Sequence, residues 1–310
     1  MTTETTGAAA RPALSNLRGG LWLALSIVSA SAMTLGVRGA SAEISSQMIV
    51  MLRGVGGLAL AFLFLAAFAN QRRDVTFKRP WLHVARGALI AISTHFGFWA
   101  ITQMPLATAT VLFFSGPIFT TMMAPLVLGE KVGLRRGLAV LVGFIGVMIV
   151  ARPGSASFDL AAVAALGSSF LFSLVLLMSR AVATADGPWA AYVSSAVMTI
   201  ILSLPVTVPI WHLPVSTAGW WLLALVALTS LIRNIGDIQA YRYGEASFLA
   251  PFAYTRIVII ASAAYLLFDE TPDFYTVLGG AVIISSAIYI ALRERRLNRE
   301  RARLAGQNPN

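Results

Sequence analysis

In this chain of 310 residues, 57% of the side chains are hydrophobic, 12% are charged and the mean hydropathy is +0.77. Soluble proteins average roughly 25% charged residues, so the composition excludes an ordinary water-soluble globule and predicts a membrane protein. The net charge of +10 does not indicate a nucleic-acid partner, because the cations lie in short segments between apolar runs and do not gather on one face.

Residues 1–17 are polar and predict a disordered cytoplasmic leader, since they lack the order of a cleavable signal peptide. A membrane-spanning helix needs about 20 residues to cross roughly 30 Å of hydrocarbon. Residues 293–310 form a basic tail, which we expect in the cytoplasm. Between these ends, runs of spanning length predict about ten helices, at Gly19–Val37, Met48–Ala69, Trp81–Ala100, Leu106–Leu128, Leu134–Ala151, Leu160–Ser179, Trp189–Ile210, Thr217–Ala240, Ala246–Phe268 and Phe274–Leu292.

Lysine and arginine are distributed unevenly between the two sides of these spans. If the amino terminus lies inside, most of the cations fall on the cytoplasmic side, and the outer loops hold only Arg38 and Arg152. Positive charge marks the cytoplasmic side of a membrane protein. The sequence therefore predicts a multi-pass protein of the bacterial inner membrane with both termini in the cytoplasm.

The segment from Trp81 to Arg152 has a weak echo in the segment from Trp221 to Leu292. When Glu130 is set on Glu270, each apolar run of one segment meets an apolar run of the other. This indicates two five-helix repeats, at 18–152 and 153–292. Because five is an odd number of crossings, the second repeat must be inverted relative to the first, an arrangement typical of secondary transporters.

The run QMPLATATVLFFSGPIFTTMMAPLVLGEKVGLRR, with a weaker copy in GEASFLAPFAYTRIVIIASAAYLLFDET, resembles the EamA-type repeats of the drug/metabolite transporter superfamily. The chain also resembles the bacterial amino acid exporters of that superfamily, including aromatic amino acid exporters. The resemblance implies ten helices, cytoplasmic termini and a central cavity lined mainly by the first four helices of each repeat. The second copy departs from the pattern, with Arg256, Ile257 and Asp269 in place of Gly116, Pro117 and Gly129.

Ionisable groups at membrane depth cost about 2.5 to 3.5 kcal/mol on insertion scales, so they face a cavity or a partner. In the eighth predicted span, Arg233, Asn234, Asp237 and Tyr241 share one helical face. One interpretation is an Arg233–Asp237 ion pair that joins helices. In the other, Asp237 receives a proton or the ammonium group of an amino acid, while Arg233 or Arg256 faces the carboxylate.

In the third predicted span, His95, Phe98, Trp99 and Thr102 also share one face. His95 and Trp99 either pack within the protein or supply a hydrogen bond and an aromatic wall to a substrate. Arg53, in the second span, matches an arginine common in the second helix of the resembled family. Its role there is either packing or substrate orientation.

Two prolines break predicted helices. Gly116 precedes Pro117, while Tyr254 and Arg256 follow Pro251. Each proline frees a backbone carbonyl, which either lines a cavity or produces a kink.

The motifs of enzymes are missing from the sequence. It has no cysteine, its three histidines do not cluster, and it lacks metalloprotease, nucleotide-binding and nucleophile-elbow motifs. We therefore expect a protein that is not an enzyme and needs no cofactor or metal.

The sequence predicts a secondary transporter that exports small amphiphilic metabolites, with aromatic and other neutral amino acids as the favoured substrates. The alternative is a carrier of a cationic drug or a nucleotide-sugar. The expected partners are the substrate and the lipid bilayer. Energy coupling stays open, with Asp237 and His95 as titratable candidates, and so does the oligomeric state, with which a monomer is compatible.

Overall fold

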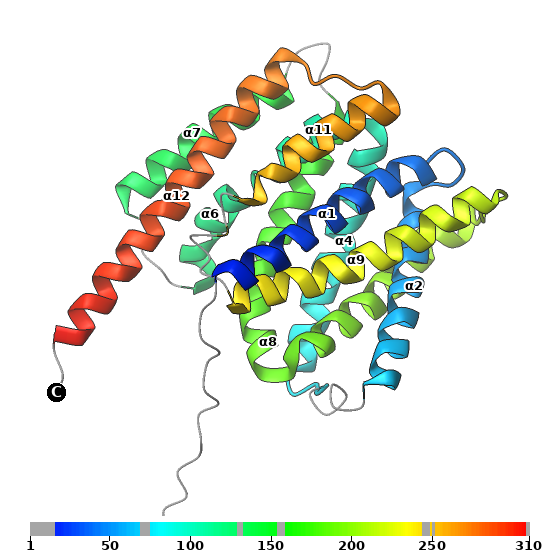
Figure 1. The fold of residues 1–310 in the computed structure, drawn as a ribbon, viewed down its shortest axis with the longest axis horizontal. Coiled ribbons are helices and arrows are strands. Elements are labelled where there is room, and N and C mark those ends of the chain that lie inside the picture. Colours follow the sequence, from blue (N-terminus) through cyan, green and yellow to red (C-terminus); the bar gives the residue numbers. More distant parts are fainter. Residues whose placement is uncertain are drawn as a thin grey trace, which may run out of the picture.

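Helices joined by short segments make up the part of the chain that the computed structural model describes (Figure 1), namely residues 16–68, 75–128, 133–153, 159–243, 249 and 252–307. No strand occurs among these residues. The helices are α1 (Asn16–Ala40), α2 (Ser46–Ala67), α4 (Pro80–Gln103), α5 (Leu106–Phe113), α6 (Gly116–Leu128), α7 (Leu134–Ala151), α8 (Leu160–Thr207), the short 3₁₀ helix η1 (Val208–Ile210), α9 (Thr217–Tyr243), α11 (Thr255–Phe268) and α12 (Phe274–Gln307).

Within the described residues, eight helical segments are long and apolar enough to cross a membrane, and Gly137–Ala151 and Thr255–Phe268 are shorter apolar helices. Large apolar side chains such as Leu63, Leu141 and Leu266 are exposed on the outside of the bundle. In water such a surface would be unfavourable, whereas lipid solvates it. The predicted all-helical membrane protein is confirmed, while ten spans in two inverted repeats stay a prediction.

The fourth predicted span is not one continuous helix. The chain turns between Phe113, the end of α5, and Gly116, the start of α6, so Pro117 lies in the first turn of a new helix. Because Pro117 has no N–H, the carbonyl of Phe113 needs another donor. The hydroxyl of Ser169 supplies it at 2.9 Å, and the hydroxyl of Ser173 donates to the carbonyl of Gly116 at 3.0 Å. The predicted span over Leu106–Leu128 thus contains a break before Pro117, at one of the two prolines expected to interrupt a helix, and Leu106–Met123 is still long and apolar enough to cross a membrane.

The sixth and seventh predicted spans meet at a kink inside α8. Gly187 has φ 81° and ψ 164°, a conformation that residues with a side chain rarely adopt. The first part of α8 begins at Asp159, whose carboxylate accepts a hydrogen bond from the N–H of Ala161 at 2.9 Å. The kink lets the second part of α8 return across the bundle.

Some predicted features lie outside the described residues. This holds for Glu130, for Pro251 and for the start of the ninth predicted span at Ala246. The described helix in that region, α11, begins at Thr255.

The helices pack in pairs that link the two halves of the chain. α1 lies along α9, α4 lies along both parts of α8, and α7 pairs with α12 at one edge of the bundle (Figure 1). In the last pair the backbones meet at glycines: a Cβ atom on Gly146 would lie 2.9 Å from the carbonyl oxygen of Gly279, and one on Gly279 would lie 2.6 Å from that of Gly146. Small residues thus bring these helices together where lipid gives no hydrophobic drive.

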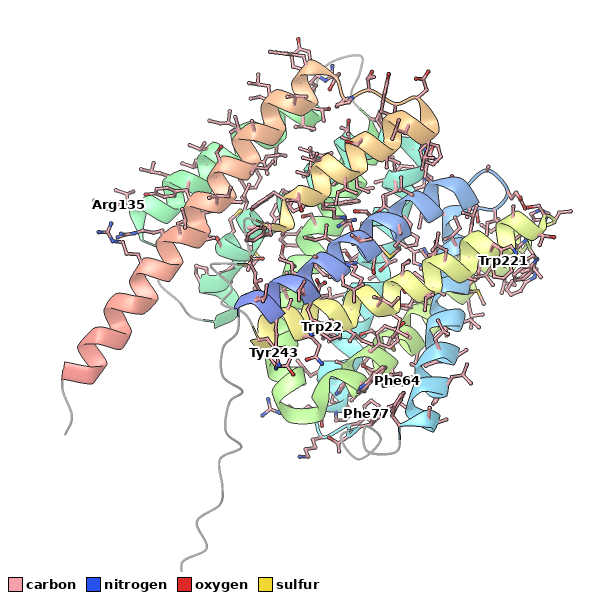
Figure 2. The ribbon with its side chains drawn as sticks, in the orientation of Figure 1. Trp22, Phe64, Phe77, Arg135, Trp221 and Tyr243 are labelled. Atoms are coloured by element: carbon pink, nitrogen blue, oxygen red, sulfur yellow. The ribbon has the colours of Figure 1, made fainter. Side chains whose placement is uncertain are left out.

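The bundle has two ends, each held by polar contacts. At the "Glu270 end", α1, the α4–α5 turn and α11 meet at Glu270; at the "Asp186 end", the segment before α4 meets the kink of α8 at Asp186. α1 begins and α12 ends on the side of the Asp186 end (Figure 1). Trp221 marks the start of α9 at the Glu270 end, and Trp22 and Tyr243 lie together near the opposite end (Figure 2).

Candidate functional site

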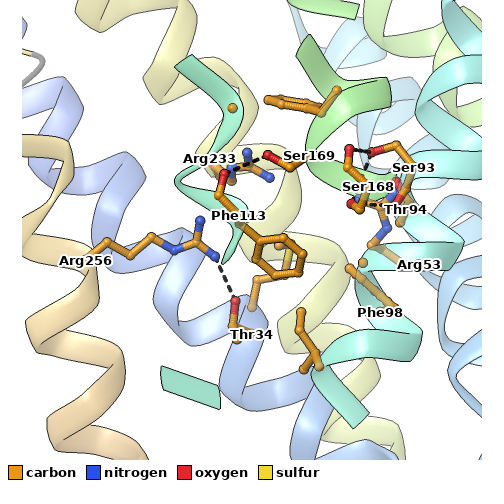
Figure 3. A pocket seen from close by; sticks show the side chains of 15 residues that line it. Thr34, Arg53, Ser93, Thr94, Phe98, Phe113, Ser168, Ser169, Arg233 and Arg256 are labelled. Atoms are coloured by element: carbon orange, nitrogen blue, oxygen red, sulfur yellow. Dashed lines mark hydrogen bonds between the residues drawn. The ribbon is translucent and has the colours of Figure 1, made fainter. Parts of the chain in front are cut away.

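Two adjoining cavities lie in the middle of the bundle, between helices of both halves, and Figure 3 shows the first of them. Their volumes are about 180 Å³ and 120 Å³, and Arg53, Thr94, Phe172 and Arg233 line both. The first cavity is also lined by Met33, Thr34, Ser93, Gly97, Phe98, Ile101, Phe113, Gly116, Ser168, Ser169 and Arg256. The second is also lined by Gly54, Ile90, Tyr192, Ser195, Ala196, Thr199, Ser230, Asn234 and Asp237.

Arg53 is placed by the start of α2. The hydroxyl of Ser45 accepts a hydrogen bond from the N–H of Met48 at 3.3 Å and caps the helix, so Arg53 follows about two turns later, inside the bundle. Its guanidinium lies 5.3 Å from the ring centroid of Phe98, a cation–π contact. Its Nε is buried and has no hydrogen-bond partner among the residues that the structure describes.

Arg256 lies in the first turn of α11 and reaches toward α1 (Figure 3). Its Nη2 donates a hydrogen bond to the hydroxyl of Thr34 at 2.9 Å. The Nε of Arg256, like that of Arg53, is buried without a partner. A hydroxyl stabilises a guanidinium but carries no charge to neutralise it.

Arg233 and Asp237 are one turn apart on α9 and form a loose ion pair. Nε of Arg233 lies 3.7 Å from Oδ2 of Asp237, and the hydroxyl of Ser26 donates to the other carboxylate oxygen. The guanidinium of Arg233 also lies 5.8 Å from the ring centroid of Phe172. This pairing fits the first of the two interpretations of the Arg233–Asp237 face, and Asn234 lines the second cavity beside it.

The charges of the cavities do not balance. Among the described residues that line them, three are arginines and one is an acid, Asp237. Arg233 is close enough to interact electrostatically with both Arg53 and Arg256. Unpaired charge at membrane depth is costly, so the lining has an excess of positive charge that its own acid does not balance.

Hydroxyl groups and aromatic rings complete the lining, and apart from Phe98 none of them was predicted from the sequence. Ser93 and Ser168 each donate to the other's carbonyl at 2.8 Å and hold α4 against α8. Phe113 and Phe172 supply apolar walls beside Phe98. Serine, threonine and phenylalanine are frequent throughout the spans, so no pattern marks these particular residues.

Several predicted site residues lie elsewhere. Nε2 of His95 is 2.9 Å from the hydroxyl of Ser203 on α8, and Trp99 packs against the apolar cluster around Ala100. Tyr254 packs against Phe114, with ring centroids 5.0 Å apart. None of these three lines the two cavities.

The remaining predicted residues lie in the first cavity, elsewhere in the described helices, or outside the described part of the chain. Gly116 lines the first cavity, and the adjacent Pro117 begins α6. Thr102 bonds to the carbonyl of Trp99 in its own helix. Pro251 and the side chain of Tyr241 lie outside what the structure describes.

Polar contacts join several elements at the Glu270 end. Arg38 on α1 forms an ion pair with Oε1 of Glu270 and donates to the carbonyls of Ile101 and Thr102, at 3.0 and 2.9 Å. Oε2 of Glu270 accepts the N–H of Leu106 at 2.7 Å. Glu270 thus joins α11, which belongs to the second half, to two elements of the first half.

The Asp186 end is held by a buried carboxylate. Oδ1 of Asp186 accepts hydrogen bonds from the Thr76 hydroxyl at 2.8 Å and the Lys78 N–H at 2.7 Å, and Oδ2 lies 3.2 Å from Nε2 of His83. Burial opposes ionisation, but these hydrogen bonds outweigh it and lower the pKa of Asp186 to about 2. Nδ1 of His83 in turn lies 2.8 Å from the hydroxyl of Ser194.

An apolar bundle with a polar, cationic cavity between its halves defines the class of membrane transporters. The EamA-like transporter family model matches residues 17–152 and 159–292. The chain belongs to this family, and it is a membrane transporter and not an enzyme. The resemblance found in the sequence is thereby confirmed.

Relatives of known function carry different small molecules. The chain is 27% identical over 280 residues to an S-adenosylmethionine uptake transporter of Rickettsia prowazekii, covering 90% of this chain and 94% of the relative. It is 26% identical to a riboflavin transporter of Vibrio cholerae (93% and 98% covered) and 27% identical to a pseudopaline exporter of Pseudomonas aeruginosa (90% and 98% covered). These relatives support the transport of small metabolites, but they do not specifically support amino acids as the substrates.

One solved crystal structure shares the fold, with a TM-score of 0.61 and 19% sequence identity over 91% of this chain and 99% of the other. At this identity the likeness concerns the fold alone.

Proposed function

We propose that this protein is a secondary transporter that exports small amphiphilic metabolites bearing a carboxylate, by alternating access through the central cavity. The observation that carries the proposal is the cavity itself, where arginines from α2, α9 and α11 meet an aromatic wall. Guanidinium groups hold carboxylates through charge-assisted hydrogen bonds. Phe98, Phe113 and Phe172 can receive the apolar part of the same molecule.

Aromatic and other neutral amino acids are the substrates that the sequence favours, and the lining is compatible with them. The carboxylate would bind Arg53 or Arg256, and the ammonium would bind Asp237. The net positive charge of the lining disfavours a cationic drug, because like charges repel at close range. Of the two alternatives from the sequence, a nucleotide-sugar fits this lining better.

Alternating access is supported by the pattern of helix contacts. In the predicted repeats, α1 corresponds to the first part of α8, α4 to α9, and α7 to α12. When corresponding helices are exchanged, the α1–α9 contact becomes the contact of the first part of α8 with α4, and the α7–α12 contact is unchanged. This is the relation expected of inverted repeats at 18–152 and 153–292. The bias of Lys and Arg supports an inner-membrane orientation with both termini in the cytoplasm and the Glu270 end outside.

Radiolabelled counterflow in proteoliposomes tests this function, with phenylalanine, threonine and a nucleotide-sugar as solutes. We expect saturable exchange of at least one carboxylate-bearing solute. It should fall about tenfold or more in Phe98→Ala, which removes a cavity wall. The adjacent variant Trp99→Ala is the matched control and should keep its exchange, because Trp99 lies outside the cavities. Exchange no greater than in protein-free liposomes, for every solute, would refute the function.

A further inference from the structure

Two of the cavity arginines share an unusual feature. Arg53 and Arg256 each have a buried Nε–H without an acceptor, and they come from helices of different halves, α2 and α11. Buried N–H groups in native proteins nearly always have a partner. An unmade bond from a charged donor is more costly than one from a neutral donor.

The charge of these two groups is also not balanced by direct contact with an acid among the described residues, although Asp237 acts on Arg256 at longer range. The carboxylate of Asp237 lies beside Arg233 and accepts from Ser26. Within the described residues, the Arg256 guanidinium donates to the neutral hydroxyl of Thr34, and Arg53 contacts the ring of Phe98. Both Arg53 and Arg256 keep part of their surface accessible, and both line the same cavity of about 180 Å³. A ligand in that cavity can therefore reach both guanidinium groups.

A zwitterion with one carboxylate would leave this imbalance in place. A neutral amino acid adds one negative and one positive charge, so the cavity would keep its excess of positive charge when loaded. A ligand with two negative charges would satisfy both donors and neutralise the excess. The rings of Phe98 and Phe113 require that such a ligand also has an apolar body.

We propose that the preferred cargo is a small organic dianion with an apolar body, which places negative charge at both Arg53 and Arg256. The inference rests on the proposed function, since it concerns the same cavity, and it specifies the charge of the amphiphilic cargo. Two carboxylates or one phosphate monoester supply the same charge. The test distinguishes these two sources.

The experiment compares three ligands that share a phenyl group: phenylsuccinate with two carboxylates, 3-phenylpropionate with one, and phenyl phosphate. Binding to the purified full-length protein is measured by the ligand-dependent rise in melting temperature and by competition against the solute found in counterflow. We expect phenylsuccinate or phenyl phosphate to bind about tenfold or more tightly than 3-phenylpropionate, the gain of one charge-assisted contact. Whichever dianion binds more tightly identifies the anionic chemistry.

The preference for the dianion must depend on the two arginines. In Arg53→Gln and in Arg256→Gln, the affinity ratio between dianion and monoanion should fall to near one, while 3-phenylpropionate still binds. Arg135→Gln removes a cation from the exposed start of α7 and should leave the ratio unchanged.

Equal affinity for 3-phenylpropionate and both dianions in the native protein would overturn the inference, and so would failure of all three to bind folded protein. Counterflow of another solute would leave the transport function standing in either case. A preference for the dianion that survives both substitutions would overturn the role of the arginines.

Discussion

Charged groups at the ends of the bundle have ion-pair or hydrogen-bond partners, whereas two charged groups in its centre have donors without partners in the described part of the chain. At the Glu270 end, Arg38 is paired with Glu270 and Arg152 with Asp273; at the Asp186 end, a carboxylate is held by several hydrogen bonds. In the central cavity, Arg53 and Arg256 keep buried donors without partners. The charged groups at the ends have partners, whereas two of those in the centre keep donors without partners in the described part of the chain, which we propose are available to a ligand.

The largest effect on stability is expected from Asp186→Ala. The substitution leaves the Thr76 hydroxyl, the Lys78 N–H and His83 without their shared acceptor, and such buried donors destabilise a fold. We expect a larger fall in melting temperature than in Asp159→Ala, which removes one helix-cap hydrogen bond worth about 1 kcal/mol. An equal or smaller fall would mean that the Asp186 end is not held by this carboxylate.

The contribution of Asp186 to stability should also depend on pH. The pKa of Asp186 is lowered from an ordinary value of 3.8 to about 2 in the folded protein. Its contribution to stability is therefore fully present above the ordinary value and is lost as the pH falls through that value toward 2. The difference in melting temperature between the native protein and Asp186→Ala should shrink over that acidic range only.

A substitution in the cavity should raise the melting temperature, whereas Asp186→Ala should lower it. Arg53→Gln removes an uncompensated charge, so the ligand-free protein should gain about 1 kcal/mol, a rise in melting temperature of roughly 2–4 °C. The control is Arg86→Gln, because Arg86 donates to Ser179, Ser195 and the Ala191 carbonyl. That variant should lose stability. An equal loss in Arg53→Gln would show that Arg53 stabilises the ligand-free fold, contrary to this prediction.

The smallest effect is expected from Arg152→Gln. The ion pair of Arg152 with Asp273 is exposed, with 31% and 41% of the two side chains accessible. Exposed pairs contribute about 0–1 kcal/mol. Both the melting temperature and counterflow should stay close to those of the native protein, and a strong loss of transport would assign this pair a role beyond the surface.

The sequence was sufficient for the helices because each one needs a long apolar run, and such runs are visible without tertiary information. The break before Pro117 is also a local effect, but its place in a membrane depends on Ser169, which donates to the freed carbonyl from another helix. The sequence places Arg233 and Asp237 inside the bundle because ionisable side chains avoid lipid, and both residues line the second cavity.

The site itself could not be predicted as fully. His95 and Phe98 share a helical face, yet Phe98 lines the cavity and His95 bonds to Ser203, because a helical face is wider than one cavity wall. The lack of partners for Arg53 and Arg256 is a property of the packed structure. The spacing of residues in the sequence therefore cannot predict this lack of partners.

The unbalanced arginines also have an electrical consequence. A membrane potential acts on a mobile charge with about 2.3 kcal/mol per elementary charge per 100 mV. For the proposed exporter, in a cell whose interior is negative, an empty cationic cavity would be drawn toward the cytoplasm, where it would meet its cargo. Once an anionic cargo has neutralised it, the potential no longer opposes movement outward. The voltage across the membrane would then drive the return of the empty carrier and so favour export.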